Sequence, residues 1–173
     1  PFIFDPGQGL PMFSGDDLMD FIGLADYACF NDYEAKLACD RTGRTLEQLA
    51  SQLKALIVTR GGEGSVIHTA GQQIDIPAVL PAAILDPTGC GDAYRSGILY
   101  GITHGLDWET AGQLASVMGA IKIEHRGGQL GTLALGHFAA HKSALAAVSH
   151  RSNGFDSSGA TGGCCGIETS RTH

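Results

Sequence analysis

Residues 86–97 read Asp-Pro-Thr-Gly-Cys-Gly-Asp-Ala-Tyr-Arg-Ser-Gly, and this stretch carries the strongest structural signal in the chain. A short apolar run, 83–85, precedes it, and Pro87 and Gly89 indicate a turn before a helix that has Asp92 in its first turn. The first amides of a helix lack partners within the helix and carry a partial positive charge, so they attract anions. Glycines in the turn let the backbone approach a ligand closely. The sequence therefore predicts an anion site with the carboxylate of Asp92 beside it.

A carboxylate beside an anion site suits phosphoryl transfer, in which a base takes the proton of a hydroxyl that attacks a phosphate. The stretch resembles the second signature of the PfkB (ribokinase-like) family of carbohydrate and nucleoside kinases, with Cys90 in place of the common alanine. The resemblance implies that Asp92 is the catalytic base and that the amides of Gly89, Cys90 and Gly91 form the anion hole for the transferred phosphoryl group. The residues alone leave open a second interpretation, in which Asp92 only caps the helix.

A second motif, Asn31-Asp-Tyr-Glu34, follows a predicted strand over 27–30. Residues three apart lie on one face of a helix, so both side chains can face the end of that strand. The resemblance implies that Glu34 helps to hold Mg²⁺ through water and that Asn31 lies near the phosphates. Magnesium prefers oxygen ligands and retains waters, which fits a single carboxylate. The alternative is a helix start that Asn31 caps.

Two further segments resemble the nucleotide-binding parts of the family. Thr59-Arg-Gly-Gly-Glu-Gly64 resembles a turn that contacts the nucleotide, which implies roles for Thr59, Gly61 and Gly64. As an isolated motif, this would be a hairpin turn in most proteins. The segment 115–129 resembles the helix and loop that close the adenine pocket, and the resemblance places Ser116 against the nucleotide.

Many members of the family also use K⁺, bound by main-chain oxygens beside the anion hole. By position, the resemblance implies that Asp86 and Thr88 supply such oxygens, together with Lys122 and Gly127. The cofactors that the resemblance implies are therefore ATP, Mg²⁺ and K⁺.

The predicted elements alternate between strands and helices, which is typical of an α/β fold with a mostly parallel sheet. In such folds ligands bind at the carboxyl ends of strands, and we expect each motif above to follow a strand. The resemblance implies the three-layer αβα ribokinase-like fold. The predicted strands are 1–5, 27–30, 56–59, 65–69 and 73–79. The predicted helices are one capped by Ser14 and ending near 24, then 31–39, one capped by Thr45 with leucine spacing up to Leu56, then 92–103, 108–123 and 132–148.

The resemblance covers only the carboxyl-terminal half of the family's length. We therefore expect 1–148 to be the nucleotide-binding and catalytic part of a PfkB kinase domain, with the amino-terminal half and its lid missing. Residues 149–173 are rich in Ser and Gly and are predicted to be a disordered, low-complexity tail. Because most acceptor-binding residues belong to the missing half, we expect little activity from the isolated chain.

Composition and the absence of other motifs exclude several classes of protein. The net charge of −7, without clustered Lys and Arg, argues against binding to nucleic acid, and no apolar run is long enough to span a membrane. Five cysteines with no zinc or disulfide spacing indicate reduced thiols and the cytoplasm. The place of Cys90 at a predicted helix N-terminus would favour a lowered pKa, but local sequence marks no His or carboxylate partner, and the alternative is that the turn requires only a small residue. No Gly-Lys pair exists for a P-loop, and the GxG at 89–91 lacks the third glycine of a dehydrogenase fingerprint.

The sequence thus predicts an ATP-dependent phosphotransferase that acts on a primary hydroxyl of a sugar or nucleoside. The segment 4–11 is similar to adenosine-kinase-like members and favours a nucleoside or ribose-type acceptor. A second hypothesis is a non-catalytic nucleotide-binding remnant of such a kinase.

Overall fold

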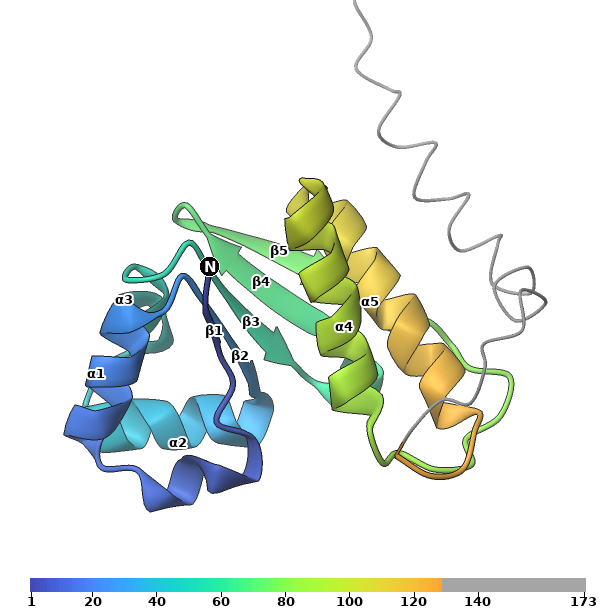
Figure 1. The fold of residues 1–173 in the computed structure, drawn as a ribbon, viewed down its shortest axis with the longest axis horizontal. Helices are drawn as coiled ribbons and strands as arrows, with labels where there is room; N and C mark the ends of the chain where they lie inside the picture. Colours follow the sequence, from blue (N-terminus) through green and yellow to red (C-terminus); the bar gives the residue numbers. More distant parts are fainter. Residues whose placement is uncertain (129–173) are drawn as a thin grey trace, which may run out of the picture.

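A five-stranded sheet forms the centre of the fold in the computed structural model, which describes residues 1–128. The strands lie in the order in which they occur in the chain (Figure 1). They are β1 (Ile3–Phe4), β2 (Tyr27–Asn31), β3 (Ala55–Thr59), β4 (Ser65–Thr69) and β5 (Gln72–Ile76). The first three strands run parallel, and β4 and β5 extend the sheet as an antiparallel hairpin. The sheet is therefore mixed, with a parallel half and an antiparallel half.

Helices cover both faces of the sheet and give the three layers that were expected (Figure 1). On one face lie α1 (Gly15–Leu24), α2 (Asp32–Thr42) and α3 (Leu46–Ala50), with a 3-10 helix, η1 (Gly7–Met12), between β1 and α1. On the other face lie α4 (Cys90–His104) and α5 (Trp108–Ile123). A one-turn 3-10 helix, η2 (Gly61–Glu63), joins β3 to β4.

The two hydrophobic cores follow from the alternation of side chains along the parallel strands. In β2, Phe30 is buried in the core under α1 and α2, whereas Cys29 is buried in the core under α4 and α5. In β3, Leu56 and Ile57 divide between the two cores in the same way. Both faces of these strands are apolar because helices cover both of them.

The helix starts predicted at Ser14 and Thr45 are confirmed, but the helix that Thr45 caps is shorter than its leucine spacing suggested. Ser14 and Thr45 each form a capping box, because these signals act within four residues of the chain. The helix that Thr45 caps ends at Ala50, and Leu53 and Leu56 follow it in a turn and in β3. These leucines pack into the same core as Leu49, so their spacing reflects a shared burial site.

The segment that leads to the 86–97 stretch is not a strand, contrary to expectation. β5 ends at Ile76 because Pro77 cannot donate to the sheet, and 77–89 has no regular secondary structure. The apolar residues Ile84 and Leu85 are exposed, and the amide of Leu85 donates to the carbonyl of Ile123 at the end of α5. The apolar run therefore lies against the end of α5 and does not pair with a neighbouring strand.

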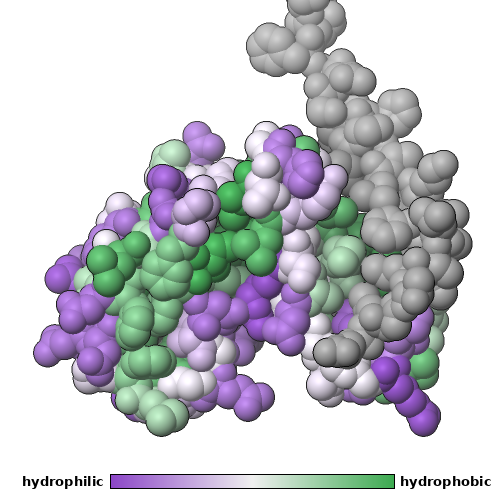
Figure 2. Space-filling view, viewed as in Figure 1, coloured by the Kyte–Doolittle hydropathy of each residue, from purple (hydrophilic) through white to green (hydrophobic). Residues whose placement is uncertain are grey.

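Figure 2 shows hydrophobic side chains gathered on the face that carries β1, and Phe2, beside this strand, is 41% exposed. Within residues 1–128, no helix combines the length and the apolar character needed to cross a bilayer. The helix predicted over 132–148 and the tail predicted over 149–173 lie outside the described residues.

Candidate active site

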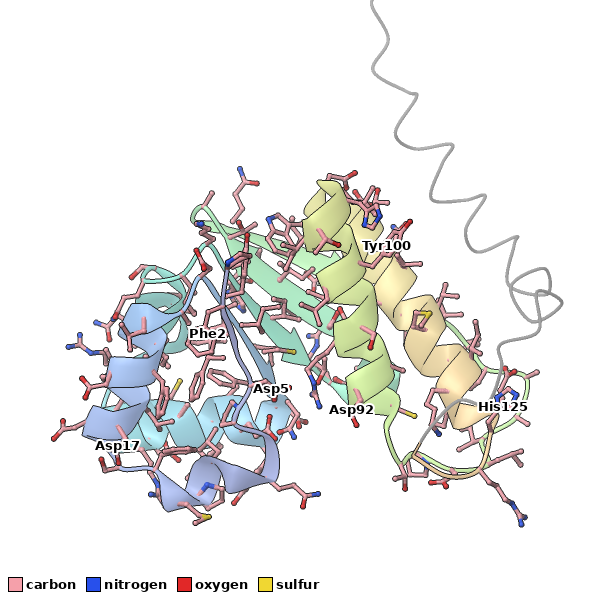
Figure 3. The ribbon with its side chains drawn as sticks, viewed as in Figure 1. Phe2, Asp5, Asp17, Asp92, Tyr100 and His125 are labelled. Carbon is pink, nitrogen blue, oxygen red and sulfur yellow. The ribbon has the colours of Figure 1, made fainter. Side chains whose placement is uncertain are left out.

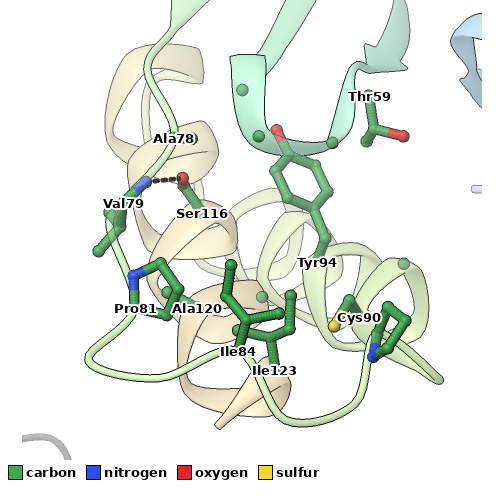
Figure 4. A pocket seen from close by; sticks show the side chains of 16 residues that line it. Thr59, Ala78, Val79, Pro81, Ile84, Cys90, Tyr94, Ser116, Ala120 and Ile123 are labelled. Atoms are coloured by element: carbon green, nitrogen blue, oxygen red, sulfur yellow. Dashed lines mark hydrogen bonds between the residues drawn. The ribbon is translucent and has the colours of Figure 1, made fainter.

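A cavity of about 340 Å³ lies where four separate segments meet (Figure 4). Its walls come from the β3–β4 turn, the loop after β5, the beginning of α4 and one side of α5. Residues that the sequence analysis singled out line it from three of these segments: Thr59, Gly61, Gly64, Cys90, Gly91 and Ser116. The fold thus brings together motifs that are far apart in the chain.

The β3–β4 turn packs closely against the end of β5 because Gly64 takes a conformation that only glycine adopts easily. Its φ is 90° and its ψ is −137°, and a Cβ atom there would collide with the carbonyl oxygen of Ile76. Arg60 does not line the cavity, because its Nη2 pairs with Asp75 Oδ1 of β5 at 3.1 Å.

The predicted turn before α4 is present, but one of the three amides expected in the anion hole, that of Cys90, is already used within it. Gly89 is the N-cap of α4, with φ 79°, and a Cβ atom there would lie 2.6 Å from the carbonyl oxygen of Gly128. The N–H of Cys90 donates to the carbonyl of Pro87 at 3.1 Å, so it is engaged within the turn. Gly91, one residue further on, faces the cavity at the positive end of the helix.

The thiol of Cys90 is not activated, so the expected lowering of its pKa is wrong. Burial raises the pKa of Cys90 and outweighs the opposing charge of Lys122. A small side chain is what the turn requires here, and the residue packs as a wall of the cavity.

Asp86 fastens this turn to the segment after α5. Its Oδ1 accepts from the amide of Thr88 at 2.9 Å, and its Oδ2 accepts from the amide of Gly127 at 2.8 Å. These hydrogen bonds lower the pKa of Asp86 to about 2. Nearby, the side chain of Lys122 is almost completely buried, and its Nζ donates to the carbonyl of His125 at 3.2 Å.

The K⁺ ion that the resemblance implies would be held by main-chain oxygens of Asp86, Thr88, Lys122 and Gly127. The hydrogen bonds of Asp86 described above involve its side-chain oxygens, so the K⁺ site stays a prediction.

Asp92 lies at the beginning of α4, next to the cavity but outside its lining (Figure 3). Its side chain is 73% exposed, and its Oδ1 accepts from Nη2 of Arg95 at 2.6 Å. A second cavity, of about 280 Å³, is lined by Asp92 together with Asp5, Cys29 and Arg95. Asp92 therefore stands between two hollows of the described chain.

Asn31 and Glu34 form a capping box at the start of α2. The Oδ1 of Asn31 accepts from the amide of Glu34 at 2.7 Å, and Oε2 of Glu34 accepts from the amide of Asn31 at 2.8 Å. Asn31 pairs in register with Thr59 at the carboxyl ends of β2 and β3, so the box adjoins the nucleotide-binding turn that was predicted. Glu34 is buried, and no three His, Cys, Asp or Glu side chains of residues 1–128 come together as a metal site.

Ser116 faces the cavity, but its hydroxyl holds the loop after β5. It donates to the carbonyl of Pro77 and accepts from the amide of Val79, both at 3.0 Å (Figure 4). Tyr94, another wall residue, shares a 2.6 Å hydrogen bond with the buried hydroxyl of Ser65, and burial raises the pKa of Tyr94 to about 12. Sequence reasoning missed this pair, because nothing local marks a contact between residues 29 positions apart.

A glycine-lined cavity beside the carboxyl ends of parallel strands is the usual ligand position of α/β proteins. The profile of the pfkB family carbohydrate kinases matches residues 3–134, and the chain belongs to this family. The family and the ribokinase-like α/β fold expected from the sequence are thereby confirmed.

Several relatives are nucleoside kinases. The nucleoside kinase of Methanocaldococcus jannaschii is 35% identical over 126 residues, which are 73% of this chain and 42% of that protein. The structure of the Burkholderia thailandensis nucleoside kinase in complex with ADP-inosine has a TM-score of 0.80 and 52% identity, over 84% of this chain and 46% of that one. The ribokinase of Thermotoga maritima has a TM-score of 0.67 at 23% identity, over 82% of this chain and 48% of that one, which is a likeness of fold. The chain thus spans less than half the length of these relatives.

Proposed function

We propose that this chain supplies the nucleotide-binding and catalytic residues of an ATP-dependent kinase that phosphorylates a primary hydroxyl of a nucleoside. The observation that carries the proposal is the cavity itself, in which Thr59, Gly64 and Gly91 come together beside Asp92. The inosine and ADP-inosine complexes of the Burkholderia relative support a nucleoside acceptor over a free sugar.

In the proposed reaction, Asp92 takes the proton of the acceptor hydroxyl as its oxygen attacks the γ-phosphorus of ATP and ADP leaves. Gly91 and the positive end of α4 stabilise the charge on the transferred group. The exposed position of Asp92 leaves its carboxylate open to an acceptor. Ser116 acts on the nucleotide through the loop that it holds.

Oε2 of Glu34 accepts from the amide of Asn31, so a Mg²⁺ ion held through water would use the other oxygen of this carboxylate, at the end of the strand that carries Asn31. The ion would neutralise charge on the phosphates of ATP. K⁺ held by main-chain oxygens near Asp86 and Thr88 stays a prediction. A cytoplasmic location, expected from the odd number of cysteines, remains a prediction.

The test uses two forms of the protein. The 173-residue chain is titrated with ATP and ADP in the presence of Mg²⁺, and we expect saturable binding that Gly64→Val abolishes. The same chain is then joined to the amino-terminal half of the Burkholderia nucleoside kinase, and inosine phosphorylation is measured. Turnover is expected to fall about 100- to 10,000-fold in Asp92→Asn, while Asp20→Asn, an exposed carboxylate on α1, should retain it.

A second candidate is a nucleotide-binding protein without catalytic activity, favoured by the position of Asp92 outside the lining of the first cavity. Binding of ATP without turnover in the joined protein would support this candidate. Failure to bind ATP or ADP would overturn both.

A further inference from the structure

Arg95, one turn into α4, lies between two carboxylates. Its Nη2 donates to Oδ1 of Asp92 at 2.6 Å, and its Nε forms an ion pair with Oδ2 of Asp5. The side chains of Arg95 and Asp5 are only 29% and 23% exposed. A guanidinium presents five donors in a rigid plane, so one arginine can fix two carboxylates in a defined geometry.

The neighbouring residues keep the guanidinium in place. A Cβ atom on Gly91 would lie 3.2 Å from Nη1 of Arg95, so the glycine leaves room for the arginine to lie back along the helix. The charge of Arg95 acts to lower the pKa of the neighbouring buried thiol of Cys29, but burial outweighs it and raises this pKa to about 12. Cys29 and Arg95 line the 280 Å³ cavity together with Asp5 and Asp92.

Asp5 comes directly after β1, where its partial burial disfavours the charged form of its carboxylate. Burial raises the pKa of Asp5 against the opposing charge of Arg95, and its Oδ1 is buried without a well-formed hydrogen bond. An exposed Asp–Arg pair three residues apart on a helix contributes little by itself. With Asp5 as its second partner, Arg95 is joined to the end of the sheet and becomes a fixed support (Figure 3 labels Asp5 and Asp92).

We propose that Arg95 is a positioning residue that holds the carboxylate of Asp92 in one orientation by tying it to Asp5. This inference rests on the proposed function, in which Asp92 is the base. Arg95 occupies Oδ1 of Asp92, and no hydrogen bond from the described residues reaches Oδ2. The oxygen left open is the one that takes the proton of the acceptor.

The first experiment measures inosine phosphorylation in the joined protein described above. Arg95→Met, which keeps the length of the side chain without its charge, should lower kcat about tenfold or more and leave KM for ATP within twofold. Arg95→Lys should recover only part of kcat. Its ammonium restores the positive charge but lacks the planar guanidinium that holds Asp5 and Asp92 in a fixed geometry. Lys54→Met, which removes the 2.7 Å ion pair with Asp26 elsewhere in the sheet layer, should leave kcat unchanged.

The second experiment needs no turnover. In the 173-residue chain, NMR couplings between Hα and Hβ of Asp92 report whether its side chain keeps one rotamer. We expect one rotamer in the wild type and in Lys54→Met, and averaging over several in Arg95→Met and Asp5→Asn.

The outcomes separate the two ideas. If Asp92→Asn is inactive and Arg95→Met turns over within twofold of wild type, the role of Arg95 is wrong and the proposed function stands. If Asp92→Asn turns over normally, the proposed function fails. Rotamer averaging already present in the wild type, or a single rotamer retained in Arg95→Met, overturns the positioning role whatever the activity.

Discussion

The carboxylate of Asp86 accepts a 2.8 Å hydrogen bond from the amide of Gly127, a residue 41 positions further along the chain. The bond closes the segment after α5 onto the turn that begins α4. The shape of that turn therefore depends on an electrostatic contact that pH can remove.

The first prediction concerns the stability of the folded chain at low pH. The pKa of Asp86 is about 2 in the folded chain and 3.8 when the chain is unfolded, so the folded protein gains stability from this group above about pH 4 and loses it as the pH falls towards 2. Asp86→Asn should be less stable than wild type at pH 7, and the difference should shrink as the pH falls through this window. Urea unfolding at pH 7 and pH 3 measures it. A difference that is constant with pH would contradict the assignment.

The second prediction concerns Gly89. Gly89→Ala forces a side chain into the left-handed region, at a cost of about 1–2 kcal/mol, and also drives its Cβ towards the carbonyl oxygen of Gly128. Gly43→Ala is the matched control, because Gly43 has φ 64° and nothing within 4 Å of an added Cβ. Thermal unfolding should show a larger loss for Gly89→Ala than for Gly43→Ala, together with weaker ATP binding. Equal losses would mean that the contact with Gly128 imposes no constraint.

The third prediction concerns the link between α4 and β4. Tyr94→Phe keeps the ring and leaves the fully buried hydroxyl of Ser65 without its partner, which should destabilise the fold by about 1–3 kcal/mol. The double variant with Ser65→Ala should be less destabilised than the sum of the two single variants. Denaturant unfolding of all four proteins gives the coupling energy, and strict additivity would contradict a direct hydrogen bond.

The fourth prediction concerns the contact between α4 and α5. A Cβ atom on Gly97 would lie 2.5 Å from Cα of Ala115, so Gly97→Ala should destabilise the fold by about 1–3 kcal/mol through overpacking. Gly23→Ala is the control, because Gly23 lies in α1 with nothing within 4 Å of an added Cβ and should gain about 0.5–1 kcal/mol. Differential scanning calorimetry compares the two. A stabilised Gly97→Ala would show that the helices can separate to admit the methyl group.

The features of the fold and of the site that the sequence predicted are those with local signals. The capping boxes at Ser14, Asn31 and Thr45 depend on side chains three residues from the cap, and the turn at Gly89 depends on its own backbone. Such features survive in any fold that contains the segment, so they can be read before the fold is known.

The rest depends on contacts across the fold. Nothing near Arg95 in the sequence indicates that its second partner is Asp5, and nothing near Tyr94 indicates Ser65. In sequence, the apolar run 83–85 resembles the end of a short strand before the anion site, but in the fold it lies against the end of α5. The structure also gives Ser116 a role as the anchor of this segment, which the resemblance to a nucleotide contact could not indicate.

The close approach of α4 and α5 also limits how a ligand can enter. Gly97 and Gly101 bring the two backbones together at Ala115 and Ala111. The two helices are therefore closely packed along this contact and form one rigid wall of the cavity. The opposite wall is the irregular segment after β5, where Ile84 lines the cavity with a side chain that is 74% exposed. If the cavity binds a nucleotide as proposed, the rate of nucleotide release should respond to changes at Ile84 far more than to changes between the helices.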